Sequence, residues 1–157
     1  MLIGYIYLAL RICLYISSLC FNMYDGAIKD NKAIGQIWAY GGGVCVCHEG
    51  TFNMSGGEIS GNTGKYGGGV STSIGAVDGL DPSTFVMTGG TIKDNTGVYG
   101  GGVYHGGETF KVSGTVNISN NTTTGGDTSN VYLRSGATIK RMSGSSLNGR
   151  EAYIGVT

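Results

Sequence analysis

The stretch that decides the fold is FNMSGGEISGN at residues 52–62, followed by GGGV at residues 67–70. Phe52 and Met54 are two residues apart, so both side chains point to one face of a strand. The Gly-Gly pair permits a turn before Ile59 resumes the apolar pattern. A helix is excluded by the glycine density, because each glycine costs up to about 1 kcal/mol relative to alanine. The stretch therefore predicts two short strands joined by a tight turn.

The same pattern recurs along the chain. Its copies begin at Phe21, Phe52, Phe85 and Phe110, which are 31, 33 and 25 residues apart, and the fourth copy is longer by one residue. Each copy is followed by a second signature, which reads GGGV at 41–44, 67–70 and 100–103 and NVYL at 130–133. These spacings fit one solenoid coil with variable loops. The sequence therefore predicts an all-β fold, a right-handed parallel β-helix (solenoid) of about four coils.

Stacking equivalent residues about 4.8 Å apart in parallel strands predicts columns of side chains inside the solenoid. The predicted core consists of the columns Phe21/Phe52/Phe85/Phe110, Met23/Met54/Met87/Val112, Ile28/Ile59/Ile92/Ile118 and Val44/Val70/Val103/Val131. A further column is formed by the asparagines that end each first element, Asn31, Asn62, Asn95 and Asn121. We expect them to adopt left-handed geometry and to hydrogen-bond to one another, as a structural ladder.

The N-terminal residues 1–20 differ from the repeat domain that we assign to residues 21–157. The stretch from Leu2 to Cys20 is almost entirely apolar and approaches the length of a membrane span, but Arg11 at its centre costs about 3 kcal/mol there. A secretory signal would require a basic residue near its start, but no Lys or Arg precedes Arg11. Three interpretations stay open: a degenerate signal, a hydrophobic cap over the first coil, and a start codon placed inside a longer gene.

The composition disfavours nucleic acid as a partner. Ten basic residues balance ten acidic ones, and only 13% of the chain is charged, so the basic footprint of a nucleic-acid binder is missing. With 31 glycines but a single proline, and with 40% hydrophobic residues, the chain is neither collagen-like nor a disordered tract. The neutral Ser, Thr and Asn coat suits an extracellular or cell-surface protein.

The four cysteines predict no metal site. Cys13, Cys20, Cys45 and Cys47 have neither Cys-x-x-Cys spacing nor a nearby His pattern that would chelate zinc. Cys45 and Cys47 lie two apart in an apolar run, so we expect both to leave one face of a strand and to fill core space.

No catalytic residues and no cofactor are predicted. Asp30 and Asp94 occupy the same place in their copies, but Gly61 interrupts them, which favours a solvated turn over a carboxylate cluster. His48 and His105 have no Ser or Cys partner at a recognisable spacing. We expect both histidines to be surface residues.

One candidate binding feature remains. Tyr40, Tyr66 and Tyr99 each precede a glycine triplet, with Trp38 nearby, which predicts an aromatic column along one corner of the solenoid. Such a column could bind the flat faces of sugar rings in a glycan. Alternatively, the tyrosines pack on one another and shield the glycine backbone, which we favour because such pairs contribute about 0.5 to 1 kcal/mol each.

The repeat, with a Thr before each of the last three Phe residues, resembles the right-handed β-helix repeats of bacterial adhesin-like surface proteins, within the pectate-lyase-like β-helix group. The resemblance covers residues 21–157. It implies a non-enzymatic, cell-surface or secreted module that acts as a stalk or as a weak multivalent glycan contact, with glycans, host or cell-surface polymers and neighbouring β-helix coils of a longer chain as partners. The alternative is a partial or vestigial carbohydrate-active β-helix, similar to a polysaccharide lyase or hydrolase, whose catalytic coils lie outside this chain. Because β-helices carry many functions, the fold does not choose between them.

Overall fold

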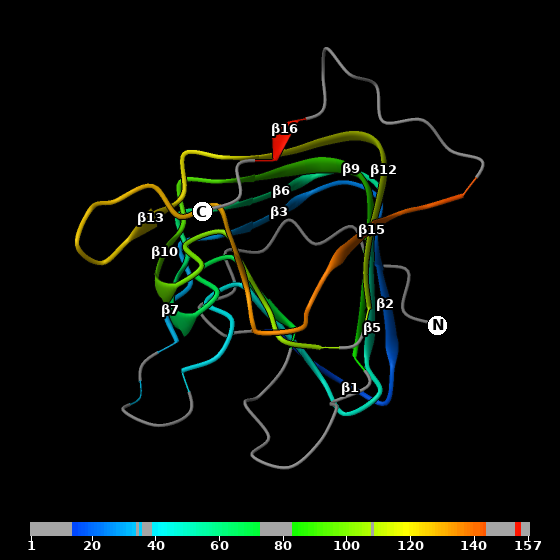
Figure 1. Ribbon diagram of the computed structural model, residues 1–157, viewed down its shortest axis with the longest axis horizontal. Helices are drawn as coiled ribbons and strands as arrows, with labels where there is room; N and C mark the ends of the chain where they lie inside the picture. Colours follow the sequence, from blue (N-terminus) through cyan, green and yellow to red (C-terminus); the bar gives the residue numbers. More distant parts are fainter. Residues whose placement is uncertain are drawn as a thin grey trace.

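The computed structural model shows a parallel β-solenoid of about four coils (Figure 1). It describes residues 14–33, 35, 39–72, 83–107, 109–143 and 153–154. Within these ranges the regular structure is entirely β-strand, which confirms the predicted fold class. Nowhere in the same ranges is there a helix long and apolar enough to span a membrane.

Strands of successive coils pair in parallel to form three sheets. The five-stranded sheet has the order β1 (Leu14–Ser17), β4 (Val44–Cys47), β8 (Val70–Thr72), β11 (Val103–His105) and β14 (Val131–Leu133). The three-stranded sheet consists of β7 (Thr63–Tyr66), β10 (Thr96–Tyr99) and β13 (Thr122–Thr123). The eight-stranded sheet contains β2 (Cys20–Met23), β5 (Thr51–Met54), β9 (Thr84–Lys93), β12 (Thr109–Ser119) and β15 (Ile139–Arg141), together with β3 (Ala27–Lys29), β6 (Glu58–Ser60) and β16 (Tyr153–Ile154).

The eight-stranded sheet forms two sides of each coil. In Figure 1, which looks along the stack, β2 and β5 lie on one side and β3 and β6 on the next. These two sides are separate strands in the first two coils, whereas β9 and β12 each run through the bend without a break. The chain turns at the Gly-Gly pair, as Gly90 shows with its φ of 91°.

The stretch assigned from sequence to an apolar N-terminal segment contributes to the first coil. β1 pairs with β4, with Leu14 beside Val44, and β2 begins at Cys20. The apolar residues before Leu14, for which a signal or a cap was considered, lie outside the described part of the chain.

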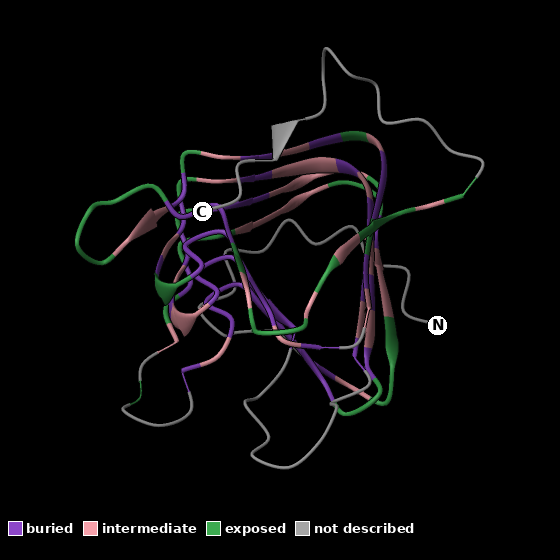
Figure 2. Ribbon diagram, in the orientation of Figure 1, coloured by how far each residue is buried: buried purple, intermediate pink, exposed green. Residues whose placement is uncertain are grey.

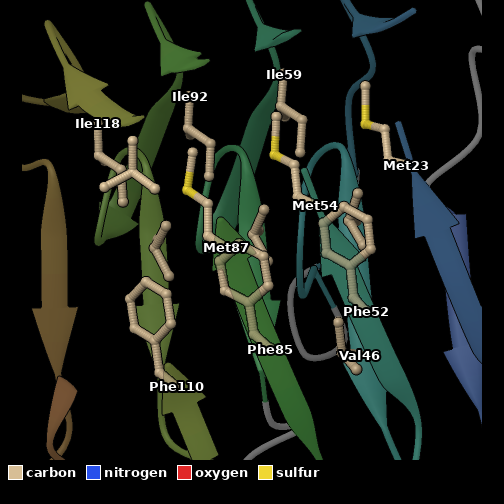
Figure 3. Close-up of a cluster of buried hydrophobic side chains, with 14 of the residues drawn as sticks. Met23, Val46, Phe52, Met54, Ile59, Phe85, Met87, Ile92, Phe110 and Ile118 are labelled. Atoms are coloured by element: carbon tan, nitrogen blue, oxygen red, sulfur yellow. The ribbon is translucent and has the colours of Figure 1, made fainter. Parts of the chain in front are cut away.

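The four predicted apolar columns are present in register. Phe52 lies beside Phe85 with ring centroids 5.2 Å apart and planes 4° apart, and Phe110 continues the stack at 4.8 Å. Figure 3 shows the phenylalanines in one row, the methionines in a second and the isoleucines in a third. In the central coils these side chains are fully buried, and each contributes about 1.5 to 3 kcal/mol by leaving water.

The asparagine ladder is also present. The main-chain N and Nδ2 of Asn62 donate to Oδ1 of Asn95 at 2.9 and 3.0 Å, and the same pair of bonds repeats from coil to coil. The expected left-handed geometry of these asparagines is wrong. It occurs one residue earlier, with φ of 57° at Asp30 and 54° at Asp94, because the ladder asparagine must direct its own N–H along the stack. Both aspartates are exposed at this turn, as expected.

The glycine triplets lie where neighbouring coils approach at backbone distance. Gly68 N donates to Gly100 O at 3.0 Å, and a Cβ on Gly68 would overlap the carbonyl oxygens of Gly101 and Thr96. Gly67 has a φ of 70°, and a Cβ there would overlap the Val70 carbonyl. Glycine is therefore required at position 68 by contact between coils, and at position 67 by the left-handed turn within its own coil.

An ion-pair network joins three coils on the outer surface. Glu58 Oε1 lies 3.0 Å from Lys29 Nζ, and its Oε2 lies 3.2 Å from Lys93 Nζ. The hydrogen bond from Ser60, at 2.7 Å, and those from the two lysines lower the pKa of Glu58 to about 2. Because these side chains are partly solvated, the network adds only modestly to stability.

Candidate functional site: a tyrosine cluster beside the glycine triplets

The predicted aromatic column is present. The Tyr40 and Tyr66 rings are stacked with centroids 4.8 Å apart and planes 18° apart, and Tyr66 and Tyr99 are stacked at 5.3 Å and 13°. Tyr66 and Tyr99 are also paired residues of β7 and β10, so the sheet register itself sets the spacing of the rings. The glycine triplets follow immediately, as the sequence indicated.

A second aromatic column interlocks with the first. Tyr104 and Tyr132 are stacked at 5.5 Å with planes 9° apart, and their rings meet Tyr66 and Tyr99 edge-on at 5.2 and 5.6 Å. These two tyrosines were not predicted as part of the column. The available signal was alternation, because each follows an inward valine and must therefore face outward. We call Tyr40, Tyr66, Tyr99, Tyr104 and Tyr132 the tyrosine cluster.

The cluster reaches solvent mainly through two of its five tyrosines. Tyr99 is 41% exposed and Tyr132 is 37% exposed, whereas Tyr104 is only 7% exposed. Burial raises the pKa of both Tyr40 and Tyr104 above the usual tyrosine value, so their hydroxyl groups stay protonated at neutral pH. The cluster can therefore both donate and accept hydrogen bonds.

Stacking limits where a flat ligand could bind. Tyr66 has a ring on each face, Tyr40 on one side and Tyr99 on the other. The ammonium of Lys65 lies 5.3 Å from the centroid of the same ring, a distance compatible with a cation–π contact. A sugar ring therefore cannot enter the middle of the column, and the more exposed Tyr99 and Tyr132 are the accessible contacts.

The two cysteines of β4 share a face and are buried, as predicted, but that face is not the apolar core. Val44 and Val46 belong to the core cluster, so strand alternation places Cys45 and Cys47 on the opposite face. Cys45 is in register with Ser71, in the row that continues to Tyr104. Cys20 is exposed, and Cys13 lies outside the described residues.

The prediction that His105 is a surface residue is wrong. Its side chain is 0% exposed, its Nδ1 lies 2.6 Å from Thr72 Oγ1, and its ring centroid lies 5.6 Å from that of Phe110. The reason is its spacing of two from the inward Val103, which directs it into the solenoid. Residues in register form a second inner column on this sheet, Ile16, Val46, Thr72, His105 and Leu133. His48, by contrast, is exposed as predicted.

His105 predicts a loss of stability in mild acid. Burial lowers its pKa to about 4, whereas an unfolded histidine titrates near 6.5. Between these values the unfolded chain binds a proton that the folded chain refuses, so the free energy of unfolding falls as the pH falls. We expect a loss of about 2 kcal/mol between pH 7 and pH 5, measured by urea denaturation at each pH.

The double variant Thr72→Val/His105→Leu is the matched test, because it turns the inner column apolar without leaving the threonine hydroxyl unpaired. We expect it to lose this pH dependence, whereas His48→Gln should retain it. Glu58, with its pKa of about 2, acts only at lower pH. An unchanged slope in the double variant would show that His105 is not the titrating group.

The other candidates from the sequence were a metal site and Trp38. No group of three or more His, Cys, Asp or Glu within the described ranges is placed to hold a metal ion. Trp38 lies outside these ranges.

Comparisons with known proteins add no further assignment: no family model, curated protein or solved structure matches the chain.

Proposed function

We propose that the chain is a non-enzymatic repeat module of an extracellular or cell-surface protein, which serves as a stiff spacer and makes weak, multivalent glycan contacts through the tyrosine cluster. The observation that carries the proposal is the cluster itself: five tyrosines gathered from four coils, with Tyr99 and Tyr132 exposed. The resemblance to adhesin-like β-helix repeats supports the same function.

The interior supports the role of a spacer. The apolar columns and the asparagine ladder are contacts between one coil and the next. Interactions of this kind stabilise a stack of coils, and their strength does not require a ligand. A solenoid held in this way separates whatever lies at its two ends.

The cluster supports a glycan as the ligand. Tyrosine offers an apolar ring for the C–H faces of a sugar and a hydroxyl for its hydroxyl groups. Because only Tyr99 and Tyr132 are well exposed, each site should bind weakly, with a dissociation constant on the order of millimolar. Useful adhesion would then require many modules acting together through effective concentration.

The proposal predicts which tyrosines respond to a glycan. In an NMR titration with neutral oligosaccharides and mucin-type glycans, we expect the signals of Tyr99 and Tyr132 to shift more than those of Tyr66. Changing Tyr99 and Tyr132 to alanine should abolish binding with little loss of fold, because both side chains are over a third exposed.

The matched control is Tyr24→Ala, since Tyr24 is 66% exposed and does not belong to the cluster. The original column is tested by the variant with Tyr40, Tyr66 and Tyr99 all changed to alanine. If no glycan moves the tyrosine signals, or if the folded variants bind as well as the parent, the cluster only packs the corner and the chain is a spacer alone.

A further inference from the structure

A basic side chain lies on the same outward face as the exposed part of the tyrosine cluster. Tyr132 belongs to β14, and Arg134 follows two positions later, where its main-chain N still donates to His105 O at 2.9 Å. Strand alternation therefore directs both side chains to one face, with their Cα atoms about 6.6 Å apart. Arg134 is exposed, and Figure 2 shows the coil that leads into β15 mainly as exposed and intermediate.

The charge of Arg134 also reaches the more buried tyrosines. Burial raises the pKa of Tyr40 and Tyr104, and the positive charge of Arg134 opposes this rise at both hydroxyl groups. Because such an effect falls with distance, the guanidinium lies near tyrosines that come from two different coils. Lys65 brings a second positive charge, with its ammonium 5.3 Å from the centroid of the Tyr66 ring. The tyrosine cluster is therefore accompanied by two cations.

No acidic group of the described chain neutralises Arg134. Within the ranges that the structure describes, its guanidinium makes no ion pair and no hydrogen bond. Residues 128–143 contain three basic residues and no acidic one. In the preceding coil the neighbour of Arg134 is Gly106, which has no side chain that could cover the guanidinium. This charge is therefore accessible to a ligand.

Exposed aromatic rings beside a guanidinium suit an anionic sugar. Tyr99 and Tyr132 can contact the apolar C–H face of a sugar ring. The guanidinium is a planar fork of N–H donors, which matches the oxygens of a carboxylate or a sulfate group. A neutral sugar would make the aromatic contact but would leave the arginine without a charged partner. An anionic sugar makes both contacts at once.

We propose that the glycan bound by the tyrosine cluster is acidic, with a carboxylate or sulfate group held by Arg134 while the sugar ring rests on Tyr99 and Tyr132. This inference rests on the proposed function and names the class of ligand. Arg134 is then the residue that selects acidic over neutral glycans. Lys65, which lies against Tyr66, adds attraction for the same anion without contacting it.

The test is an NMR titration of the full chain with two trisaccharides that differ only in charge. One is a trisaccharide of glucuronic acid, and the other is its neutral twin, in which each carboxyl group is reduced to an alcohol. At low salt we expect the acidic form to bind roughly fivefold more tightly. The difference should shrink as salt is added, because exposed charges are screened. A sulfated form of the neutral twin is titrated in parallel, and a gain with either anion supports the proposal and identifies the group that is bound.

The variant that carries the test is Arg134→Gln. It should remove the preference for the acidic trisaccharide and leave the affinity for the neutral twin unchanged. Arg134→Lys, which keeps the charge but not the planar fork, should retain part of the preference. The matched control is Arg141→Gln, because Arg141 is also exposed but belongs to β15 in a different sheet, so this variant should keep the preference in full.

The outcomes separate this inference from the proposed function. If the charged and neutral trisaccharides bind equally, or if Arg134→Gln keeps the preference, the inference is wrong while glycan binding by the tyrosine cluster stands. If none of the trisaccharides shifts the tyrosine signals, the proposed function fails and the inference fails with it. A short single-stranded oligonucleotide offers bases and phosphates for the same two contacts, and its tighter binding than any of the trisaccharides would overturn the choice of a glycan.

Discussion

Replacing Ile59 with aspartate is expected to unfold the solenoid. Ile59 is fully buried between Ile28 and Ile92, in the middle of a column that runs through the stack. A carboxylate there has no partner and loses its hydration, which costs several kcal/mol beyond the lost apolar contact. Domains of this size have only about 5 to 15 kcal/mol of stability. The measurement is far-UV circular dichroism during urea denaturation, where the folded baseline of the variant should be missing.

The control for this change is Val86→Asp. Val86 lies between Phe85 and Met87 on β9 but faces outward, so its charge stays hydrated and the variant should fold. Ile59→Val, which removes a single methylene, should cost about 0.5 to 1.5 kcal/mol. A stable Ile59→Asp protein, with its midpoint close to that of the parent, would contradict the register of the columns.

The solenoid could be predicted because its two determinants are local in sequence. Alternation fixes which side chains face inward, as for Phe52 and Met54, and glycine pairs fix where the chain turns. Because the strand pattern and the glycine turns both repeat, a parallel register places equivalent residues of successive coils beside one another. The asparagine ladder follows from the same register, which is why Asn62 and Asn95 could be paired before their hydrogen bonds were seen.

The wrong predictions of side-chain location arose where inward and outward positions were not counted along the strand from a residue known to point inward. His105 was assigned to the surface by its chemical type, although its distance from Val103 places it inside. Cys45 and Cys47 were correctly placed on one face, but the flanking valines already occupied the inner one. In each case the face of the strand was decided by whether the residue lies an odd or an even number of positions from a neighbour known to point inward. The polarity of the side chain predicted its location less well.

The tyrosine cluster was only half accessible to sequence reasoning. Tyr40, Tyr66 and Tyr99 occupy one position in the repeat, so their stacking follows from register. Tyr104 and Tyr132 come from a different sheet, and their edge-on contacts depend on how two sheets meet at a corner. Such an angle is set by the turn through the glycine triplet, which a repeat pattern does not specify.

The same register makes the asparagine ladder the second place where one substitution should have a large effect. Asn95 lies inside the stack, and its Nδ2 donates to the carbonyls of Ile59 and Lys93 at 3.0 and 2.8 Å. Its Oδ1 accepts from the main-chain N of Asn62 at 2.9 Å. Asn95→Leu keeps the approximate volume but leaves the buried N–H of Asn62 and the Ile59 carbonyl without these partners. Each such group costs about 1 to 3 kcal/mol, so we expect a loss on the order of 4 kcal/mol in urea denaturation.

The same substitution at Asn31 separates the ladder from a general cost of removing a buried amide. Asn31 is also buried, at 1% exposed, but its Oδ1 has no donor within the described residues, and Asn62 Oδ1 keeps its bond from the main-chain N of residue 31 in the variant. Asn31→Leu should therefore cost about 1 kcal/mol or less. Equal losses at the two positions would show that the amides act singly. A several-fold larger loss at Asn95 would show that the stack is held by bonds passed from each coil to the next.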